Sequence, residues 1–228
     1  MDPELLIRTF PRLYHMAHVD AWDGICRHGL LSTCALLDLF EINGAHRHQI
    51  EMCQRKRCVI IEHPVYGRAV IRDNMPMDDI GLRRALKGMT PSEWYRLLNG
   101  KVFFWLTEER LAKLLSAGAY RSSEHCVLTI NTRSLVERHA DKVWLCPMNS
   151  GCTKPFPHPR SIDIFRRIAD YPFDHWRRRK GGARKAIVEL AVDGAVSDIT
   201  ALVEAVAVQN QKGVLREVWS RADSTANV

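Results

Sequence analysis

Hydrophobic residues recur along the chain at two spacings, which predict helices and strands respectively. Apolar residues spaced three or four positions apart predict helices over residues 3–9, 21–29, 32–42, 91–98, 108–118 and 161–169. Several of these runs begin after a residue that can cap a helix, or with a Pro in the first turn. The capping candidates are Asp2, Asp20, Thr90 and Thr107. Short apolar or alternating runs predict strands over residues 13–16, 58–62, 68–72, 101–106, 125–131, 142–146, 185–192 and 201–208, the last of which also fits a helix. Because the two types alternate irregularly, the sequence predicts an α+β fold.

The predicted elements follow one another without an internal repeat or a low-complexity linker. A chain of 228 residues fits one large domain, and we expect its core over residues 12–208 and a C-terminal tail over residues 209–228. No apolar run approaches the length of a membrane span, and the first residues lack the pattern of a signal peptide. We therefore expect a protein of the cytoplasm, and we expect it to be a monomer.

The seven cysteines are odd in number and irregularly spaced. In a cytoplasmic protein they are expected to be reduced thiols. Structural zinc is the alternative, and it would use Cys53 with Cys58 or Cys146 with Cys152. Neither pair forms a Cys-x-x-Cys motif, so no metal is expected.

Basic residues outnumber acidic ones, which gives a formal net charge of +7. The densest basic cluster is "HWRRRKGGARK" at residues 175–185. Such a cluster favours an acidic partner, and nucleic acid is the most common one. The alternative is a solvated basic surface without a polyanion.

A single carboxylate, Glu189, interrupts the apolar strand predicted over residues 185–192. Burial in such a strand raises the pKa of a carboxyl group unless a cation holds it ionised. Strand alternation places Ile187 and Ala191 on the face of Glu189, and the small Ala191 leaves room beside the carboxylate. Carboxylates of this kind concentrate at functional sites. The alternative is that this face of the strand is solvated.

Three further groups are candidates for chemistry. His15 lies within the first predicted strand, where a histidine packed in the core is the alternative. Arg72 ends a strand and is suited to clamping a diphosphate, unless it pairs with Asp73. The aromatic run 103–105 places rings on both faces of its strand, so one face can stack on a flat ligand while the other packs in the core. No Walker-type loop, dinucleotide-fold glycine fingerprint or nucleophile elbow occurs.

Several short motifs resemble, in order and spacing, the DarT-type ADP-ribosyltransferases and, more broadly, the NAD-using transferases with a His-aromatic-Glu signature. They are "YH" and "RHGLLS" near the start, "VFFWL" in the middle, "NSG" followed by "FPHPRSIDIFRRIADYPFDHW", and "VELAVDGAV" after the basic cluster. The resemblance covers about residues 12–200, and residues 43–100 match it least. The blocks "RDN-x-P", "VFFWLT" and "VELAV" also resemble an uncharacterised bacterial family.

The resemblance implies an ADP-ribosyltransferase-like fold, with a split, mixed or antiparallel central sheet and helices mainly from the N-terminal half. It implies Glu189 and Arg72 as catalytic residues. NAD would be bound by His15 at a ribose, by Arg72 at the phosphates (Arg55 and Arg57 are the alternatives), and by Phe104 or Trp105 at the nicotinamide, with Tyr14 as a further cofactor-binding residue. The acceptor would be selected by a loop over residues 175–185, through Trp176, Arg177, Arg178, Arg179 and Lys180.

The implied reaction transfers ADP-ribose from NAD to DNA or RNA, at a single-stranded or flipped base, and releases nicotinamide. A carboxylate near the reacting carbon stabilises the positive charge that develops there and can accept the proton of the incoming nucleophile. A toxin or defence role with an antitoxin or reversing hydrolase as partner follows by analogy. The alternatives are the same reaction on a protein or a small molecule, and a non-enzymatic nucleic-acid-binding module.

Overall fold

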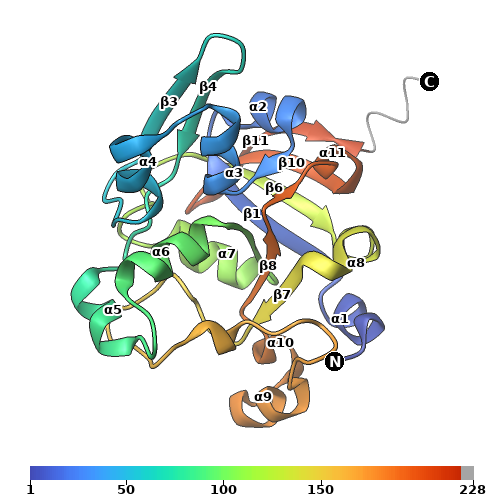
Figure 1. Cartoon of the computed structure of the whole chain (residues 1–228). Helices are drawn as coiled ribbons and strands as arrows, with labels where there is room; N and C mark the ends of the chain where they lie inside the picture. The colour runs from blue at the N-terminus through green and yellow to red at the C-terminus, as the bar shows by residue number, and fades with distance from the viewer. Residues whose placement is uncertain (222–228) are drawn as a thin grey trace.

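The computed structural model describes residues 1–221 and is built around one large sheet (Figure 1). The sheet has seven strands, and each pairs with its neighbours in antiparallel fashion. Their order is β11 (Gly213–Ser220), β10 (Val203–Asn210), β6 (His125–Asn131), β1 (Arg12–His18), β5 (Lys101–Trp105), β8 (Glu189–Asp193) and β7 (Val143–Cys146). The predicted α+β class is therefore confirmed, and the sheet is antiparallel rather than mixed.

The sheet is split between strands β1 and β5. β1 pairs with β6 along its whole length, from Arg12 opposite Asn131 to His18 opposite His125. Between β1 and β5, by contrast, the described residues form one register pair, Tyr14 opposite Trp105. The two strands diverge from that pair. Backbone groups that would be hydrogen-bonded in a continuous sheet are therefore free to bond to side chains in the gap.

Most of the helices come from the first half of the chain, as predicted. They are α1 (Pro3–Thr9), α2 (Trp22–His28), α3 (Thr33–Leu39), α4 (Gly44–Glu51), α5 (Asp79–Ala85), α6 (Pro91–Asn99) and α7 (Glu108–Leu115), followed by α8 (Thr132–His139), α9 (Phe173–Lys180), α10 (Ala183–Ala186) and α11 (Ile199–Leu202). Single turns of 3₁₀-helix cover Ala140–Lys142 and Ile162–Ile164. Two short ribbons complete the fold, β2 (Leu30–Leu31) with β9 (Ala195–Val196) and β3 (Val59–His63) with β4 (Gly67–Ile71).

Local capping chemistry fixes several helix starts as predicted. Asp2, Thr90 and Thr107 each accept a hydrogen bond from an amide of the following first turn, and Thr90 with Glu93 forms a complete capping box. Asp20 does not cap α2, because that helix begins at Trp22 and its N-cap residue makes no side-chain hydrogen bond.

Three expected element boundaries were wrong for identifiable reasons. The helix expected over residues 161–169 is reduced to one 3₁₀ turn, because Arg166 exchanges both of its backbone hydrogen bonds with Leu145 of β7. The strand expected to begin at residue 185 begins at Glu189, after the short helix α10. Residues 213–220, expected in a C-terminal tail, form the edge strand β11, which pairs with β10 from Asn210 opposite Gly213 onward.

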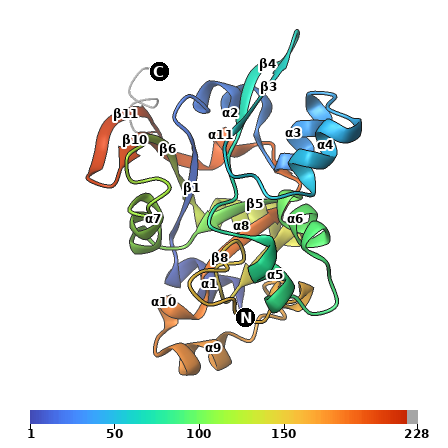
Figure 2. The same ribbon diagram turned by 90° about the vertical axis from the view of Figure 1, so that its left-hand side faces the viewer.

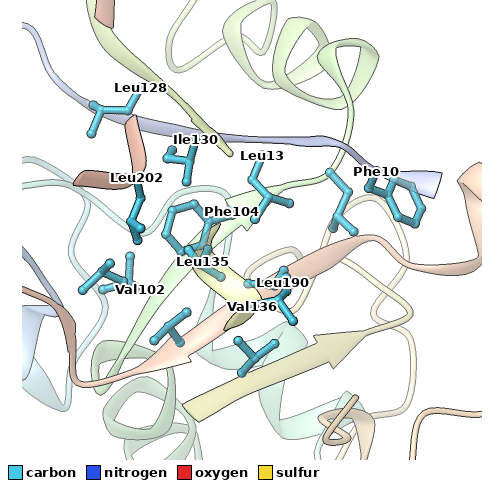
Figure 3. Close-up of a cluster of buried hydrophobic side chains, with 14 of the residues drawn as sticks. Phe10, Leu13, Val102, Phe104, Leu128, Ile130, Leu135, Val136, Leu190 and Leu202 are labelled. Atoms are coloured by element: carbon cyan, nitrogen blue, oxygen red, sulfur yellow. The ribbon is translucent and has the colours of Figure 1, made fainter. Parts of the chain in front are cut away.

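The main core lies between the sheet and helices α1, α2, α8 and α11. Figure 3 shows its centre, where Leu13 of β1, Phe104 of β5 and Leu190 of β8 meet Leu135 of α8. A separate small core joins the β3–β4 hairpin to α3 and α4. The hairpin therefore stands on helices rather than on the main sheet (Figure 1).

The turn after α2 has a steric requirement for glycine. Gly29 has φ of 81°, and a Cβ atom there would lie 2.7 Å from the Cα of Ser197. This close approach seats the "RHGLLS" segment against β9, and the amide of Ser32 then donates to the carbonyl of Gly194 at 2.8 Å. The segment is thereby held over the gap in the sheet.

Candidate functional site

A cavity of about 520 Å³ opens where β1 and β5 diverge. Its walls are the part of β1 from His15 to His18, strand β5, helix α2 with the turn into α3, and β4 with the two residues that follow it. Glu189 of β8 contributes to the same wall. The volume lies within the range of about 300–1,000 Å³ that is usual for small-molecule sites. The split in the sheet thus creates the site, and the "RHGLLS" turn and β4 enclose it.

His15 spans the gap between the two strands. Its Nδ1 lies 2.8 Å from the carbonyl oxygen of Phe103 on β5. A carbonyl only accepts, so Nδ1 carries the proton and the neutral ring presents Nε2 as an acceptor. Burial, helped by the charge of Arg72 and opposed by the hydrogen bond to Phe103, lowers the pKa of His15 to about 4. The ring is therefore neutral at pH 7 and suited to accepting a hydrogen bond from a ligand hydroxyl.

Glu189 is 4% exposed and sits opposite Trp105 on one side and Cys146 on the other. Its Oε2 accepts a hydrogen bond from the amide of Ser150 at 3.0 Å. Burial raises the pKa of Glu189 to about 7, against the lowering effects of Ser150, Arg160 and Arg110. A carboxyl group with this pKa exchanges protons readily near neutral pH, as a general base must.

The neighbours of Glu189 differ in part from those that strand alternation predicted. Ala191 lies on the same face of the sheet as Glu189, packed near Cys146. Ile187 instead joins the main core with Leu190. The reason is that the backbone leaves α10 at residue 187 and becomes a regular strand at Glu189.

A buried arginine that the sequence analysis did not identify holds the segment facing Glu189. Arg160 is 2% exposed, and its Nη1 donates to the carbonyl of Ser150 at 2.8 Å while Nη2 donates to that of Cys152 at 2.7 Å. Its Nε donates to the carbonyl of His158. These bonds direct the Ser150 amide at Glu189. The sequence around Arg160, "PHPRS", does not predict this role, because two of the carbonyls that it binds belong to residues 150 and 152 and come close to it only when the loop folds.

Arg72, directly after β4, reaches into the cavity wall. Its Nη1 donates to the carbonyl of Met16 at 3.1 Å, and its guanidinium lies 4.7 Å from the centre of the Tyr120 ring. Within residues 1–221, Asp73 forms no ion pair with Arg72; its carboxylate instead accepts a hydrogen bond from the Tyr120 hydroxyl at 2.7 Å. The alternative of an Arg72–Asp73 pair is therefore not observed, and donors of Arg72 are left for a ligand.

The two competing arginines lie elsewhere. Arg55 is buried, and it donates to the carbonyls of Ile50 and Arg72 and to the side chain of Asn99. Burial lowers its pKa to about 10. Arg57 is exposed, and neither residue lines the cavity. Of the three arginines, the structure thus places Arg72 beside His15.

The aromatic candidates divide between the cavity and the core. Trp105 lines the cavity and is partly exposed. Phe104 also borders the cavity, with its ring centre 5.8 Å from that of His15, but it is 1% exposed and belongs to the main core. Tyr14 points to the opposite face of β1, where its hydroxyl donates to Glu108 at 2.9 Å, and it does not line the cavity. A ligand contact for Tyr14 is therefore not supported by its position.

The basic cluster is helical rather than a loop. Residues 173–180 form α9, which Gly181 ends in the left-handed conformation, and residues 183–186 form α10. Trp176, Arg177, Arg178, Arg179 and Lys180 do not line the cavity. In both views α9 lies at the end of the molecule opposite the β3–β4 hairpin (Figures 1 and 2).

Two further observations concern residues 1–221. Within this range there is no cluster of three or more His, Cys, Asp or Glu side chains arranged to hold a metal ion. None of the helices formed by these residues is both long and apolar enough to cross a membrane.

Comparison with known proteins identifies the family. Residues 11–203 match the model of a family described as "Family of unknown function (DUF7002)". The chain belongs to the DUF7002 family. The matched residues include the whole cavity wall, so the split sheet, His15, Arg72 and Glu189 all lie within the part of this DUF7002 protein that defines its family. Among curated proteins, none matches the chain significantly.

One solved structure similar to this DUF7002 protein is Thermosipho africanus DarTG in complex with ADP-ribose. The two share 16% sequence identity with a TM-score of 0.47, over 88% of this chain and 44% of that one. This chain thus spans less than half of the solved chain. A likeness at this level assigns no function.

Proposed function

We propose that this DUF7002 protein is an NAD-dependent ADP-ribosyltransferase that transfers ADP-ribose to a nucleic-acid acceptor and releases nicotinamide. One observation carries the proposal: His15, Arg72 and Glu189, far apart in sequence, line a single cavity at the split in the sheet. The motif resemblance described above supports the same reaction. A cytoplasmic location and an antitoxin or reversing hydrolase as partner stay predictions.

The cavity residues fit the chemical groups of NAD. Arg72 offers guanidinium donors to the phosphates, and the neutral His15 offers Nε2 to a ribose hydroxyl. Trp105 is a partly exposed ring on the cavity wall and suits a flat nicotinamide better than Phe104, which is packed in the core. Glu189 closes the arrangement on the β8 side.

The reaction breaks the bond between the ribose carbon and the nicotinamide nitrogen and forms a bond from that carbon to the acceptor. The acceptor loses one proton, which the ionised Glu189 accepts. The negative charge of Glu189 also stabilises the positive charge that develops on the ribose. Nicotinamide leaves as a neutral molecule, so no further proton donor is required at that end.

The decisive experiment incubates the protein with labelled NAD and, separately, single-stranded DNA, RNA and cell lysate. Label is expected in the nucleic-acid fraction and to become soluble after nuclease treatment. Label that stays with protein after nuclease treatment would replace nucleic acid by a protein acceptor. Absence of both transfer and NAD consumption would contradict the proposal.

Tyr120 is expected to be a positioning residue for Arg72. Its ring lies under the guanidinium, and its hydroxyl is anchored to Asp73 at 2.7 Å and near the carbonyl of Met75 at 3.0 Å. Tyr120→Leu removes the ring, so we expect the KM for NAD to rise between about 2-fold and 30-fold, as the loss of a cation–π contact of about 0.5–2 kcal/mol implies, with little change in kcat.

Tyr120→Phe is the matched control, because it keeps the ring and removes only the hydroxyl. It is expected to lower stability by about 1 kcal/mol and to raise KM less than Tyr120→Leu does. Equal kinetic effects of the two variants, after correction for folding, would show that the ring does not position Arg72.

A further inference from the structure

The basic helices α9 and α10 adjoin, outside the cavity, the two chain segments that carry and face Glu189. Lys180, the last residue of α9, donates from Nζ to the carbonyl of Pro147. Pro147 begins the segment whose Ser150 amide binds Glu189. Helix α10 ends at Ala186, three residues before Glu189. Lys180 is therefore held at the edge of the segment that faces the carboxylate.

Arg110 approaches Glu189 from a different element. Helix α7 begins three residues after Trp105, which is the register partner of Glu189, and Arg110 lies in its first turn. Arg184 of α10 and Glu109 of α7 form an exposed ion pair with an N–O distance of 3.6 Å, so α10 lies within reach of this turn. Chain connectivity and strand pairing thus bring Arg110 near Glu189, and Arg110 also lies close enough to Lys180 for their charges to interact.

The guanidinium of Arg110 is half-buried. Within residues 1–221 it makes no hydrogen bond and no ion pair. Burial lowers the pKa of Arg110 in spite of the opposing effect of Glu189. Burial and, to a smaller extent, the charge of Arg110 together lower the pKa of Lys180 to about 8. Two cations that have lost part of their hydration and repel each other are stabilised when an anion binds between them.

We propose that Arg110 and Lys180 form a phosphate-binding subsite that holds the backbone of a single-stranded nucleic-acid acceptor beside Glu189. The subsite rests on the proposed function. Arg177 of α9 is not part of it, because its guanidinium already pairs with Asp174 at 3.1 Å. The Trp176 ring, packed against the main core, lies with its centre 5.1 Å from the Lys180 nitrogen and so restricts where the ammonium can lie. A guanidinium, which can bind two phosphate oxygens, and an ammonium are groups with which proteins hold the backbone of single strands.

Binding of a short, fluorescently labelled single-stranded DNA, and of the same sequence as RNA, tests the subsite without NAD. Each phosphate contact contributes about 0.7 to the slope of log K against log salt for single strands. Arg110→Gln and Lys180→Gln are each expected to reduce that slope by about 0.7 and to weaken binding roughly fivefold at about 0.1 M salt. Arg110→Lys keeps the charge and should keep most of the slope. Arg83→Gln, on the exposed face of α5, removes an equal charge elsewhere and should change neither quantity.

The outcomes are separable. Unchanged slopes in both Gln variants, with melting temperatures like that of the wild type, would overturn the subsite. An equal loss in Arg83→Gln would also overturn it, because the effect would then be one of net charge. Displacement of the oligonucleotide by polyglutamate at equal charge concentration would assign the cluster to an acidic protein instead. The proposed function fails independently, if the wild-type protein binds oligonucleotide through this cluster but does not consume NAD.

Discussion

Replacement of Glu189 by Gln is expected to abolish ADP-ribosyl transfer and, at the same time, to stabilise the protein above pH 7. The variant keeps the shape of the side chain and an oxygen that accepts from the Ser150 amide at the 3.0 Å contact. It removes the negative charge and the ability to accept a proton. General-base catalysis contributes about 10²- to 10⁴-fold, so transfer should fall by at least this factor.

The stability gain follows from the direction of the pKa shift. The folded protein holds the proton of Glu189 up to pH 7, whereas the unfolded chain releases it near the ordinary value of 4.5. The folded state therefore binds more protons between these values, and the free energy of unfolding falls as the pH rises through them. A shift of this size corresponds to about 3 kcal/mol. Glu189→Gln should recover up to that amount at pH 8 and almost none at pH 4.5.

Denaturant unfolding at the two pH values and initial transfer rates measure both effects. The rate of the wild-type protein should rise with pH up to about 7 and then level off, because ionised Glu189 accepts the proton. His15, with a pKa of about 4, stays neutral over this range and adds no second transition. Glu62→Gln, at an exposed carboxylate on β3, is the matched control and should leave rate and stability unchanged. A Glu189→Gln variant that transfers at the normal rate, or that is less stable at pH 8, would contradict the assigned role.

Three arginine variants are expected to separate ligand binding from folding. Arg72→Gln removes charge-assisted bonds to the phosphates, each worth about 1.5–3 kcal/mol, so NAD affinity should fall about 10- to 100-fold. Its stability should change little, because Arg72 bonds to a single carbonyl, that of Met16, among the described residues. Isothermal titration with NAD and urea unfolding measure the two quantities.

The other two arginines give opposite controls. Arg55→Met leaves the carbonyls of Ile50 and Arg72 and the side chain of Asn99 without their donor, so it should destabilise the protein by at least about 2 kcal/mol. Arg57→Gln alters an exposed side chain and should stay within about 0.5 kcal/mol, with normal NAD affinity. Loss of NAD affinity in Arg57→Gln, with normal affinity in Arg72→Gln, would move the phosphate contact to the segment that precedes β3.

The sequence by itself determined the secondary structure and the helix caps, which depend on residues that are neighbours in the chain. Alternation and apolar runs located the strands around His15, Phe104 and Glu189, and side chains such as Thr90 and Thr107 fixed helix starts through their own first turns. The desolvation of Glu189 was also predictable, because its neighbours in the chain are apolar and carry it into a buried strand.

Tertiary structure alone decided which of these residues meet. The divergence of β1 and β5 after a single pair makes the cavity, and pairing between distant strands leaves no local signal. Arg72, Arg55 and Arg57 are chemically alike, and they differ in what lies around them: a cavity wall, a set of buried carbonyls, and solvent. Arg110 and Arg160 approach Glu189 from other segments through helix packing and loop hydrogen bonds. Since such contacts are set by long-range geometry, the chemistry of each group could be predicted from the sequence, but its neighbours could not.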